Sequence, residues 1–266
     1  MKGAIYRKIA PFVFSVLLIG GLAASEEYCL YLRSLLKDSA DGKSPPLTTR
    51  KPNIPLHSGQ VASVGAQSRL EFIGPAGEML RIGHNSEFAP VGLNRLEFSH
   101  GSFLFFVQRE GPRYSFVTKG VEILIAGYGT FLGEIMPLGG LKLIPLTGEG
   151  QIISQSQSSV EKFYPGQIHF YLPNGERPPN VEIDITLLVN SCPLITAFED
   201  TLPSFREITK RAHLQARTIK FRSNSFVYDA VGKDRIRFLV PQPTEKKDKP
   251  GNGSKFGKWL KSKLPF

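Results

Sequence analysis

Between Gln60 and Leu172, short runs of β-branched and aromatic residues alternate with glycines at intervals of about nine residues. Regularly spaced short strands with turn residues between them are typical of an all-β sandwich, barrel or solenoid. Tyr114–Thr118 alternates apolar and polar residues and predicts one wet face, whereas Val121–Ala126 is almost wholly apolar and predicts a strand covered on both faces. The predicted strands are Arg69–Ile73, Glu78–Ile82, Arg95–Ser99, Ser102–Gln108, Tyr114–Thr118, Val121–Ala126, Leu141–Leu146, Gln151–Ser154, Val160–Tyr164 and Gln167–Tyr171.

The residues before this region have a different pattern. From Glu27 to Lys37 the apolar residues fall near helical spacing, which predicts a short helix. Asp38–Leu56 is rich in Pro, Ser, Thr and Lys and predicts a linker.

After Pro173 the pattern changes again, to that of a small α+β region. A strand is predicted over Val181–Ile185, and a helix over Thr201–Arg217. Two further strands are predicted around Phe226–Ala230 and Arg235–Val240, before a polar, lysine-rich tail typical of disorder. One face of the predicted helix carries Phe205, Ile208, Ala212 and Gln215. We therefore expect a mainly β fold, an antiparallel sandwich or short solenoid, with the segments 1–25, 26–58, 59–172, 173–240 and 241–266.

The N-terminus has the features of an export signal. The basic residues Lys2, Arg7 and Lys8 precede an apolar run, Ile9–Ala24, which ends in small residues up to Ser25. This order predicts a secretory signal cleaved after Ser25, and a periplasmic or secreted protein. An uncleaved membrane anchor is the alternative, although the run is shorter than the roughly 20 residues that a spanning helix needs.

The net charge of +10 first suggests a nucleic-acid partner. Three of these charges lie in the signal, and five lie in the tail from Glu245 to Phe266. The region between them is nearly neutral, whereas nucleic-acid binding needs a basic patch on a folded face. We therefore expect no nucleic-acid partner.

The last residues of the tail form a basic amphipathic stretch. Apolar Phe256, Trp259 and Leu260 alternate with Lys258 and Lys261. Such a pattern is typical of segments that lie on an anionic membrane surface. A solubilising tail is the alternative, because so short a helix is marginal in isolation.

The two cysteines, Cys29 and Cys192, could form a disulfide in an oxidising compartment, or remain two separate thiols. The chain has no Cys-x-x-Cys or His-x-x-x-His spacing and no Gly-x-Ser-x-Gly elbow. Gly127–Gly133 imitates a dinucleotide-binding turn, but no helix follows, so it predicts a β-turn. These observations predict no catalytic residue, metal or cofactor, with an unrecognised hydrolase as the remaining enzymatic alternative.

Five short motifs in a fixed order give the segment Leu96–Gln167 a family resemblance. They are a glycine with an aromatic and a valine after it, an aromatic strand ending in threonine, a Gly-Thr pair, a Glu-Gly pair and a closing Gly-Gln. In this order and spacing the segment resembles the extracytoplasmic β domain of the FecR family. The residues concerned are Gly101, Phe105, Val107, Tyr114, Phe116, Thr118, Gly129, Thr130, Glu149, Gly150, Gly166 and Gln167.

The order Phe131-Leu132 departs from the family pattern and raises the prospect of a register shift that would exchange inward and outward residues. Independently of the family, Gly101, Gly129, Gly150 and Gly166 are expected at strand boundaries with positive φ.

FecR relatives are the extracytoplasmic parts of signalling proteins, and a cytoplasmic segment before the membrane binds a sigma factor. Only Met1–Lys8 precede the apolar run here. The resemblance therefore implies the fold and a binding role, but not the signalling through a sigma factor. The leading hypothesis is a non-enzymatic envelope binding or sensor module that engages an envelope protein or polymer. The alternative is a structural, self-assembling envelope protein attached to a surface through its tail.

Overall fold

The glycine-punctuated apolar runs form strands. The computed structural model describes residues 28–38, 47–219, 223–229 and 235–241, so the expected signal and tail lie outside the described residues. The helices are α1 (Ile185–Ser191), α2 (Pro193–Thr196) and α3 (Phe205–Ile219). The strands are β1 (Cys29–Lys37), β2 (Leu47–His57), β3 (Ala62–Val64), β4 (Ser68–Ile73), β5 (Met79–Ile82), β6 (Ser86–Gly92), β7 (Arg95–Val107), β8 (Tyr114–Val117), β9 (Glu122–Ile135), β10 (Leu141–Ser154), β11 (Ser159–Lys162), β12 (Gln167–Tyr171), β13 (Val181–Ile183), β14 (Ser223–Asp229) and β15 (Arg235–Pro241).

Two N-terminal predictions are wrong. The expected helix over Glu27–Lys37 is strand β1, and much of the expected linker is strand β2, which pairs with β1. A bulge between Leu32 and Ser34 explains the first error. It changes which side of β1 faces inward, so the apolar residues lose the strict alternation by which a strand is recognised.

Three long strands bend and contribute to two layers. The first part of β7 pairs with β6 and β8, and its second part pairs with β5 and β9. β9 likewise pairs first with β8 and then with β7, while β10 pairs with β12 near its start and with β11 near its end. The described strands therefore form one open, mainly antiparallel sheet folded into a sandwich, whose corners are strands that pass between layers. β7 and β8 are parallel.

Four glycines form the corner in β9 and β10. Gly127 pairs with Gly150 and Gly129 with Gly148, and all four have φ between +95° and +150°. A Cβ added at Gly129 would lie 2.1 Å from the carbonyl oxygen of Thr147. Only glycine accommodates both this backbone conformation and this close approach. The expected β-turn at this segment is therefore wrong. Of the glycines expected at strand boundaries, Gly129 and Gly150 lie inside these two long strands, whereas Gly166 directly precedes β12 as expected.

Gly101, with φ +104°, has a related role inside β7. Before it, Leu96 and Phe98 face the inner core; after it, Phe103 and Phe105 face the same core. The inward positions thus change from even to odd residue numbers at this glycine, which keeps both halves of the strand packed on one core.

In β9 the odd-numbered positions face the inner core along the whole strand. Ile123, Ile125, Phe131 and Ile135 all face the inner core, and Leu132 faces the opposite side. The order Phe131-Leu132 therefore causes no exchange of inward and outward residues along this strand.

The inner core between the two layers is rich in aromatic rings. Phe103 from one layer stacks on Phe98 and Phe116 from the other, with ring centroids 4.5 Å and 5.0 Å apart. Phe131 meets Phe163 edge-on at 5.1 Å. Each fully buried phenylalanine contributes roughly 1.5–3 kcal/mol, so these rings hold the layers together.

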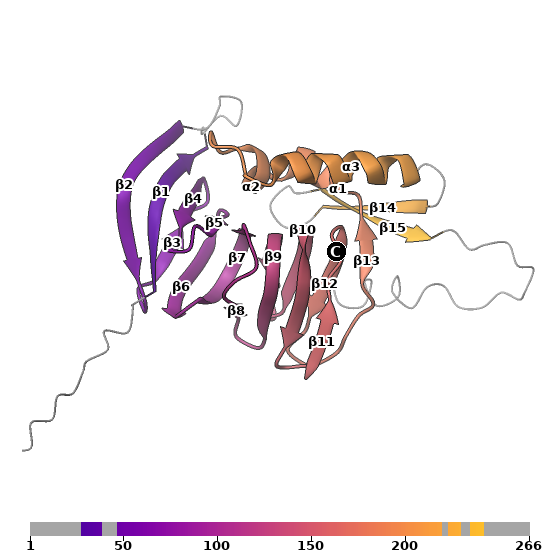
Figure 1. Cartoon of the computed structure of the whole chain (residues 1–266), viewed down its shortest axis with the longest axis horizontal. Coiled ribbons are helices and arrows are strands. Elements are labelled where there is room, and N and C mark those ends of the chain that lie inside the picture. The colour runs from indigo at the N-terminus through magenta and orange to yellow at the C-terminus, as the bar shows by residue number, and fades with distance from the viewer. Residues whose placement is uncertain (1–27, 39–46, 220–222, 230–234, 242–266) are drawn as a thin grey trace, which may run out of the picture.

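The three helices lie along one side of the sheet (Figure 1). They form a second core with the outer face of one layer. The predicted helix is confirmed as α3, with Ile208 and Ala212 facing this core. The predicted small α+β C-terminal region is confirmed, and it continues the sheet because β13 pairs with β12. The sheet side of the second core consists of Leu36, Met79, Leu104, Phe106, Leu132, Ile144, Leu146, Ile168, Phe170 and Ile183. Within the described ranges, every helix is too short or too polar to cross a membrane.

Candidate functional site

The twelve residues of the sequence motif do not gather at one site. Phe105, Val107, Tyr114 and Phe116 are buried in the inner core. The motif glycines, Gly101, Gly129, Gly150 and Gly166, all have positive φ. Exposed Glu149 lies opposite Tyr128 where β10 pairs with β9. Gln167 begins β12 and pairs with Glu182.

The two motif threonines make buried hydrogen bonds. Thr118 Oγ1 accepts from the backbone N–H of Val121 at 3.2 Å. Thr130 accepts at Oγ1 from the Thr147 hydroxyl at 3.1 Å and shares a further hydrogen bond with Ser204, beside the start of α3. These threonines therefore join strands to a turn and to the helical layer.

Arg81 of β5 is fully buried and fastens the helical layer to the sheet. Its Nε donates to Glu71 Oε2 of β4 at 2.8 Å, and its Nη1 donates to the Leu194 carbonyl at 2.9 Å. The guanidinium also lies 4.3 Å from the centroid of the Phe198 ring. Burial lowers the pKa of Arg81, and the Glu71 carboxylate opposes that change. A buried arginine bonded to carbonyls of α2 positions that helix.

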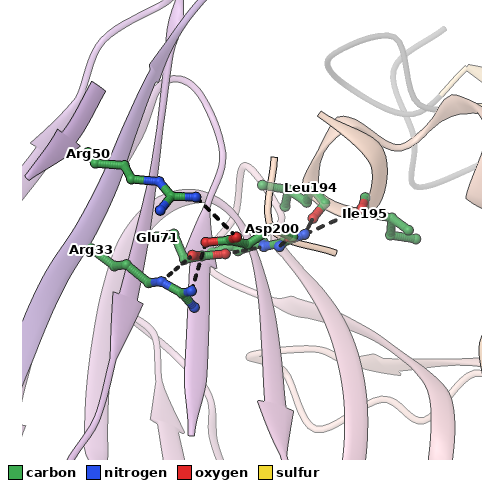
Figure 2. Close-up of polar contacts among 7 residues, drawn as sticks. Arg33, Arg50, Glu71, Leu194, Ile195 and Asp200 are labelled. Atoms are coloured by element: carbon green, nitrogen blue, oxygen red, sulfur yellow. Dashed lines mark hydrogen bonds and ion pairs between the residues drawn. The ribbon is translucent and has the colours of Figure 1, made fainter. Parts of the chain in front are cut away.

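Two further arginines extend this network to the surface. Figure 2 shows Arg33 and Arg50 extending toward Asp200, which follows α2. Arg33 Nη2 lies 2.7 Å from Asp200 Oδ2, and Arg50 Nη2 lies 3.4 Å from Oδ1. Arg33 Nε also lies 3.7 Å from Glu71 Oε1. The network thus ties β1, β2, β4 and β5 to one segment of the helical layer.

A second polar cluster surrounds Glu161 of β11. Its carboxylate accepts from the Tyr171 hydroxyl at 2.7 Å and pairs with Arg177, while His169 Nδ1 lies 3.4 Å away. Burial would raise the pKa of Glu161, but contacts with His169, Tyr171 and Asn180 outweigh it and lower that pKa to about 2. The cluster fastens the segment after β12 to the β10–β11 hairpin.

The third feature is a cavity of about 740 Å³ between the β4–β5 turn and the β7–β8 loop. Glu78, at 2 % exposure, is among the residues that line it. Tyr28 donates its hydroxyl to Glu78 Oε1 at 2.9 Å, and the N–H of Ala76 donates to Oε2 at 2.9 Å. Gly74 leaves the space that this carboxylate occupies, since a Cβ there would lie 2.1 Å from Oε1. The full lining is Ala76, Glu78, Val107, Gln108, Arg109, Glu110, Gly111, Pro112 and Tyr114.

The tyrosines beside Glu78 are held in the neutral form. Burial raises the pKa of Tyr28 and of Tyr114, and the negative charge of Glu78 raises both further. Both hydroxyls therefore remain protonated and able to donate hydrogen bonds to the carboxylate across the physiological pH range.

The remaining predicted site residues fall into two groups. No disulfide joins Cys29 and Cys192: the first begins β1, and the second lies in the second core beneath the helices, where α1 ends. The tail residues lie outside the described residues. Within the part of the chain that the structure describes, no three His, Cys, Asp or Glu side chains come together as metal ligands.

Sequence reasoning missed Glu71, Glu78 and Arg81 as polar centres. All three occur in or beside predicted strands, and Arg81 interrupts an apolar run, Met79–Ile82. A charged residue within a buried strand requires a partner. That signal was available from the sequence, but the identity of the partners was not.

The molecule is thus a two-layer β protein with a helical layer docked by buried charges and a cavity that contains a carboxylate. No family model matches the sequence, and no curated protein matches it. Two solved structures of a proposed anti-sigma factor from Parabacteroides distasonis ATCC 8503 are similar, both with a TM-score of 0.38. The 1.65 Å structure is 15% identical in sequence. The match covers 46% of this chain and 59% of that structure's chain. The 2.50 Å structure is 12% identical, over 68% of this chain and 99% of its own.

Proposed function

We propose that this protein is an exported, non-enzymatic binding or sensor module of the cell envelope, built on a FecR-like β domain. The observation that carries the proposal is the contrast between its buried charges. Glu71 and Glu161 are paired with arginines in contacts that hold the fold together. Glu78 instead faces a cavity whose volume lies in the range of ligand sites.

The groups around this cavity support binding and not catalysis. A general acid or base needs a pKa near the working pH. The raised pKa values of Tyr28 and Tyr114 make them poor proton donors and acceptors at neutral pH. Export is supported by the order of charge, apolar run and small residues in Met1–Ser25.

A sensor role is supported by the position of β5. Glu78 directly precedes this strand, and Arg81 within it bonds to the carbonyls of Leu194 and Ile195 at 2.9 Å and 3.3 Å. A ligand that moved Glu78 would thus act on the strand that holds α2. The polar partners at both ends of this short strand make it a direct physical connection between cavity and helices.

The test is expression of the full chain with a C-terminal tag, followed by cell fractionation, N-terminal sequencing and crosslinking in the intact envelope. We expect an envelope or external location, Glu26 at the mature N-terminus, and a specific crosslink to an envelope protein or polymer. The matched control lacks Met1–Ser25 and should remain inside without that crosslink. A cytoplasmic full-length protein, or the same crosslinks from both forms, would contradict the proposal.

The open edge of the sheet favours one alternative, a self-assembling envelope protein. β2 (Leu47–His57) is the last strand in the sheet order, and its outer edge pairs with no other described strand. Unpaired strand edges are the usual site of strand addition between copies. Light scattering over a range of concentrations separates the two functions, because a stable monomer contradicts self-assembly.

A further inference from the structure

Glu78 differs from Glu71 and Glu161 in forming no ion pair with a cationic side chain among the described residues. Arg81 pairs with Glu71 at 2.8 Å, and Arg177 pairs with Glu161. Around Glu78 the described partners are the hydroxyls of Tyr28 and Tyr114 and the backbone N–H of Ala76. Burying a carboxylate without a counter-ion is costly, so this arrangement needs a reason other than stability.

Hydrogen bonds to both oxygens fix the position of the Glu78 carboxylate. The N–H of Ala76 can only donate, and it donates to Oε2. The Tyr28 hydroxyl donates to Oε1. Both carboxylate oxygens therefore act as acceptors. The cavity thus presents a negative charge held by fixed donors.

The rest of the cavity wall sets the character of a fitting ligand. Val107, Pro112 and the ring of Tyr114 are apolar surfaces, and Tyr114 is fixed by an edge-on contact with Phe105 at 4.8 Å. At the rim Arg109 and Glu110 have opposite charges. The net negative character of the site therefore comes from Glu78.

From this geometry we infer that the cavity binds a primary ammonium group carried on a short apolar stem. The ammonium is the counter-ion that the Glu78 carboxylate lacks, and the stem lies against Val107, Pro112 and Tyr114. A hard metal ion would need about six oxygen ligands, more than Glu78, Glu110 and the neutral hydroxyl of Tyr114 supply. An ammonium acts as a compact charge and needs no bidentate partner. A free alkylamine and a lysine side chain of an envelope protein share this chemistry.

This inference deepens the proposed binding function and rests on it for the ligand's natural setting, but its test needs only the purified chain. Titration calorimetry would use n-butylammonium, a short peptide with a central lysine, and n-butanol as the uncharged analogue. We expect saturable binding of the ammonium compounds, roughly millimolar for the small amine because it has few atoms, and none of n-butanol. If the peptide binds more tightly than n-butylammonium, the natural source of the ammonium is a lysine side chain. If it binds equally or more weakly, the source is a free amine.

Two matched substitutions locate the site. Glu78→Gln keeps the shape and removes the charge, and we expect it to weaken ammonium binding at least tenfold. Glu97→Gln removes an exposed carboxylate that does not line the cavity and should change affinity less than twofold. Equal effects of the two substitutions, or unaltered binding by a folded Glu78→Gln, would overturn the assignment.

A measurement on the unaltered protein covers the case in which Glu78→Gln does not fold. The amide of Ala76 donates to the Glu78 carboxylate, so its NMR signal should shift on adding n-butylammonium and not on adding n-butanol. Absence of that shift with every ammonium compound would also overturn the inference. The crosslinking test of an envelope partner could still succeed in that case, so the two failures are distinguishable.

Discussion

Arg81 lies at 0 % exposure between the sheet and the helical layer, where its charge is matched by Glu71 and by backbone carbonyls. In such a pair the loss of one partner leaves the other charged and buried, which costs more than the pair contributes. Glu161 is the largely buried partner in a second cluster, where the Tyr171 hydroxyl and exposed Arg177 contact its carboxylate. At the residue scale, the stability of this protein therefore depends on a few buried polar side chains as well as on its aromatic core.

Replacing Arg81 by methionine is expected to lower the free energy of unfolding by about 3–5 kcal/mol, because Glu71 stays buried without its closest cation. The double variant Arg81→Met/Glu71→Leu should recover part of this loss. Arg95→Met is the matched control, since Arg95 is exposed and pairs with Glu122 at the surface, and should cost at most about 1 kcal/mol. Urea unfolding followed by circular dichroism measures all three. Equal effects of Arg81→Met and Arg95→Met would contradict a special contribution of the buried Arg81–Glu71 pair to stability.

The lowered pKa of Glu161 predicts that the stability of the protein depends on pH. Its pKa in the folded protein is about 2 against an ordinary value of 4.5, so the folded state binds fewer protons between these values. The stabilisation is therefore complete above about pH 4.5 and disappears as the pH falls through 2. Between pH 5 and 2, the free energy of unfolding should fall by about 1–2 kcal/mol less for Glu161→Gln than for the unmodified protein, allowing for partial solvent screening. Unfolding curves at stepped pH test this, with exposed Glu97→Gln as the variant expected to follow the unmodified protein.

At the scale of elements, the long strands are possible because glycines allow them to turn between layers. Sequence reasoning located most strands of the β region and the helix α3, since their apolar spacing is regular. It divided β7 and β10 in two, because it treated Gly101 and Gly150 as breaks between strands. It missed β1 and β2, where a bulge and prolines obscure the alternation.

Gly129→Ala is expected to destabilise the protein by about 2 kcal/mol or more. Its φ is +140°, and the new Cβ would lie 2.1 Å from the Thr147 carbonyl oxygen. Gly65→Ala is the matched control, because a Cβ at Gly65 meets nothing within 4 Å, and it should change stability by less than about 0.5 kcal/mol. Thermal unfolding of both variants gives the comparison. A neutral Gly129→Ala would show that the corner does not depend on this glycine.

At the scale of the whole molecule, charge is concentrated at the two ends of the sequence, and the tail contributes a separate prediction. Deleting Gly251–Phe266 should abolish binding to vesicles of anionic lipid and leave the folded region unchanged by circular dichroism. Vesicles of zwitterionic lipid, to which neither form should bind, provide the control in a sedimentation assay. Unchanged binding to anionic vesicles after the deletion would contradict a membrane-surface role for the tail.

The sequence by itself determined the mainly β class, the helix α3 with its buried face and the glycine-dependent backbone, because these follow from local spacing and from the steric limits of each residue. The export signal and the basic tail are likewise sequence patterns, and their roles stay predictions. Only the tertiary structure decided that strands bend between two layers, that Arg81 fastens the helices, and that Glu78 faces a cavity beside Tyr114. The physical reason is that the partner of a buried charge comes from a distant segment, as with Arg81 and the Leu194 carbonyl, and spacing along the chain does not specify which segments meet.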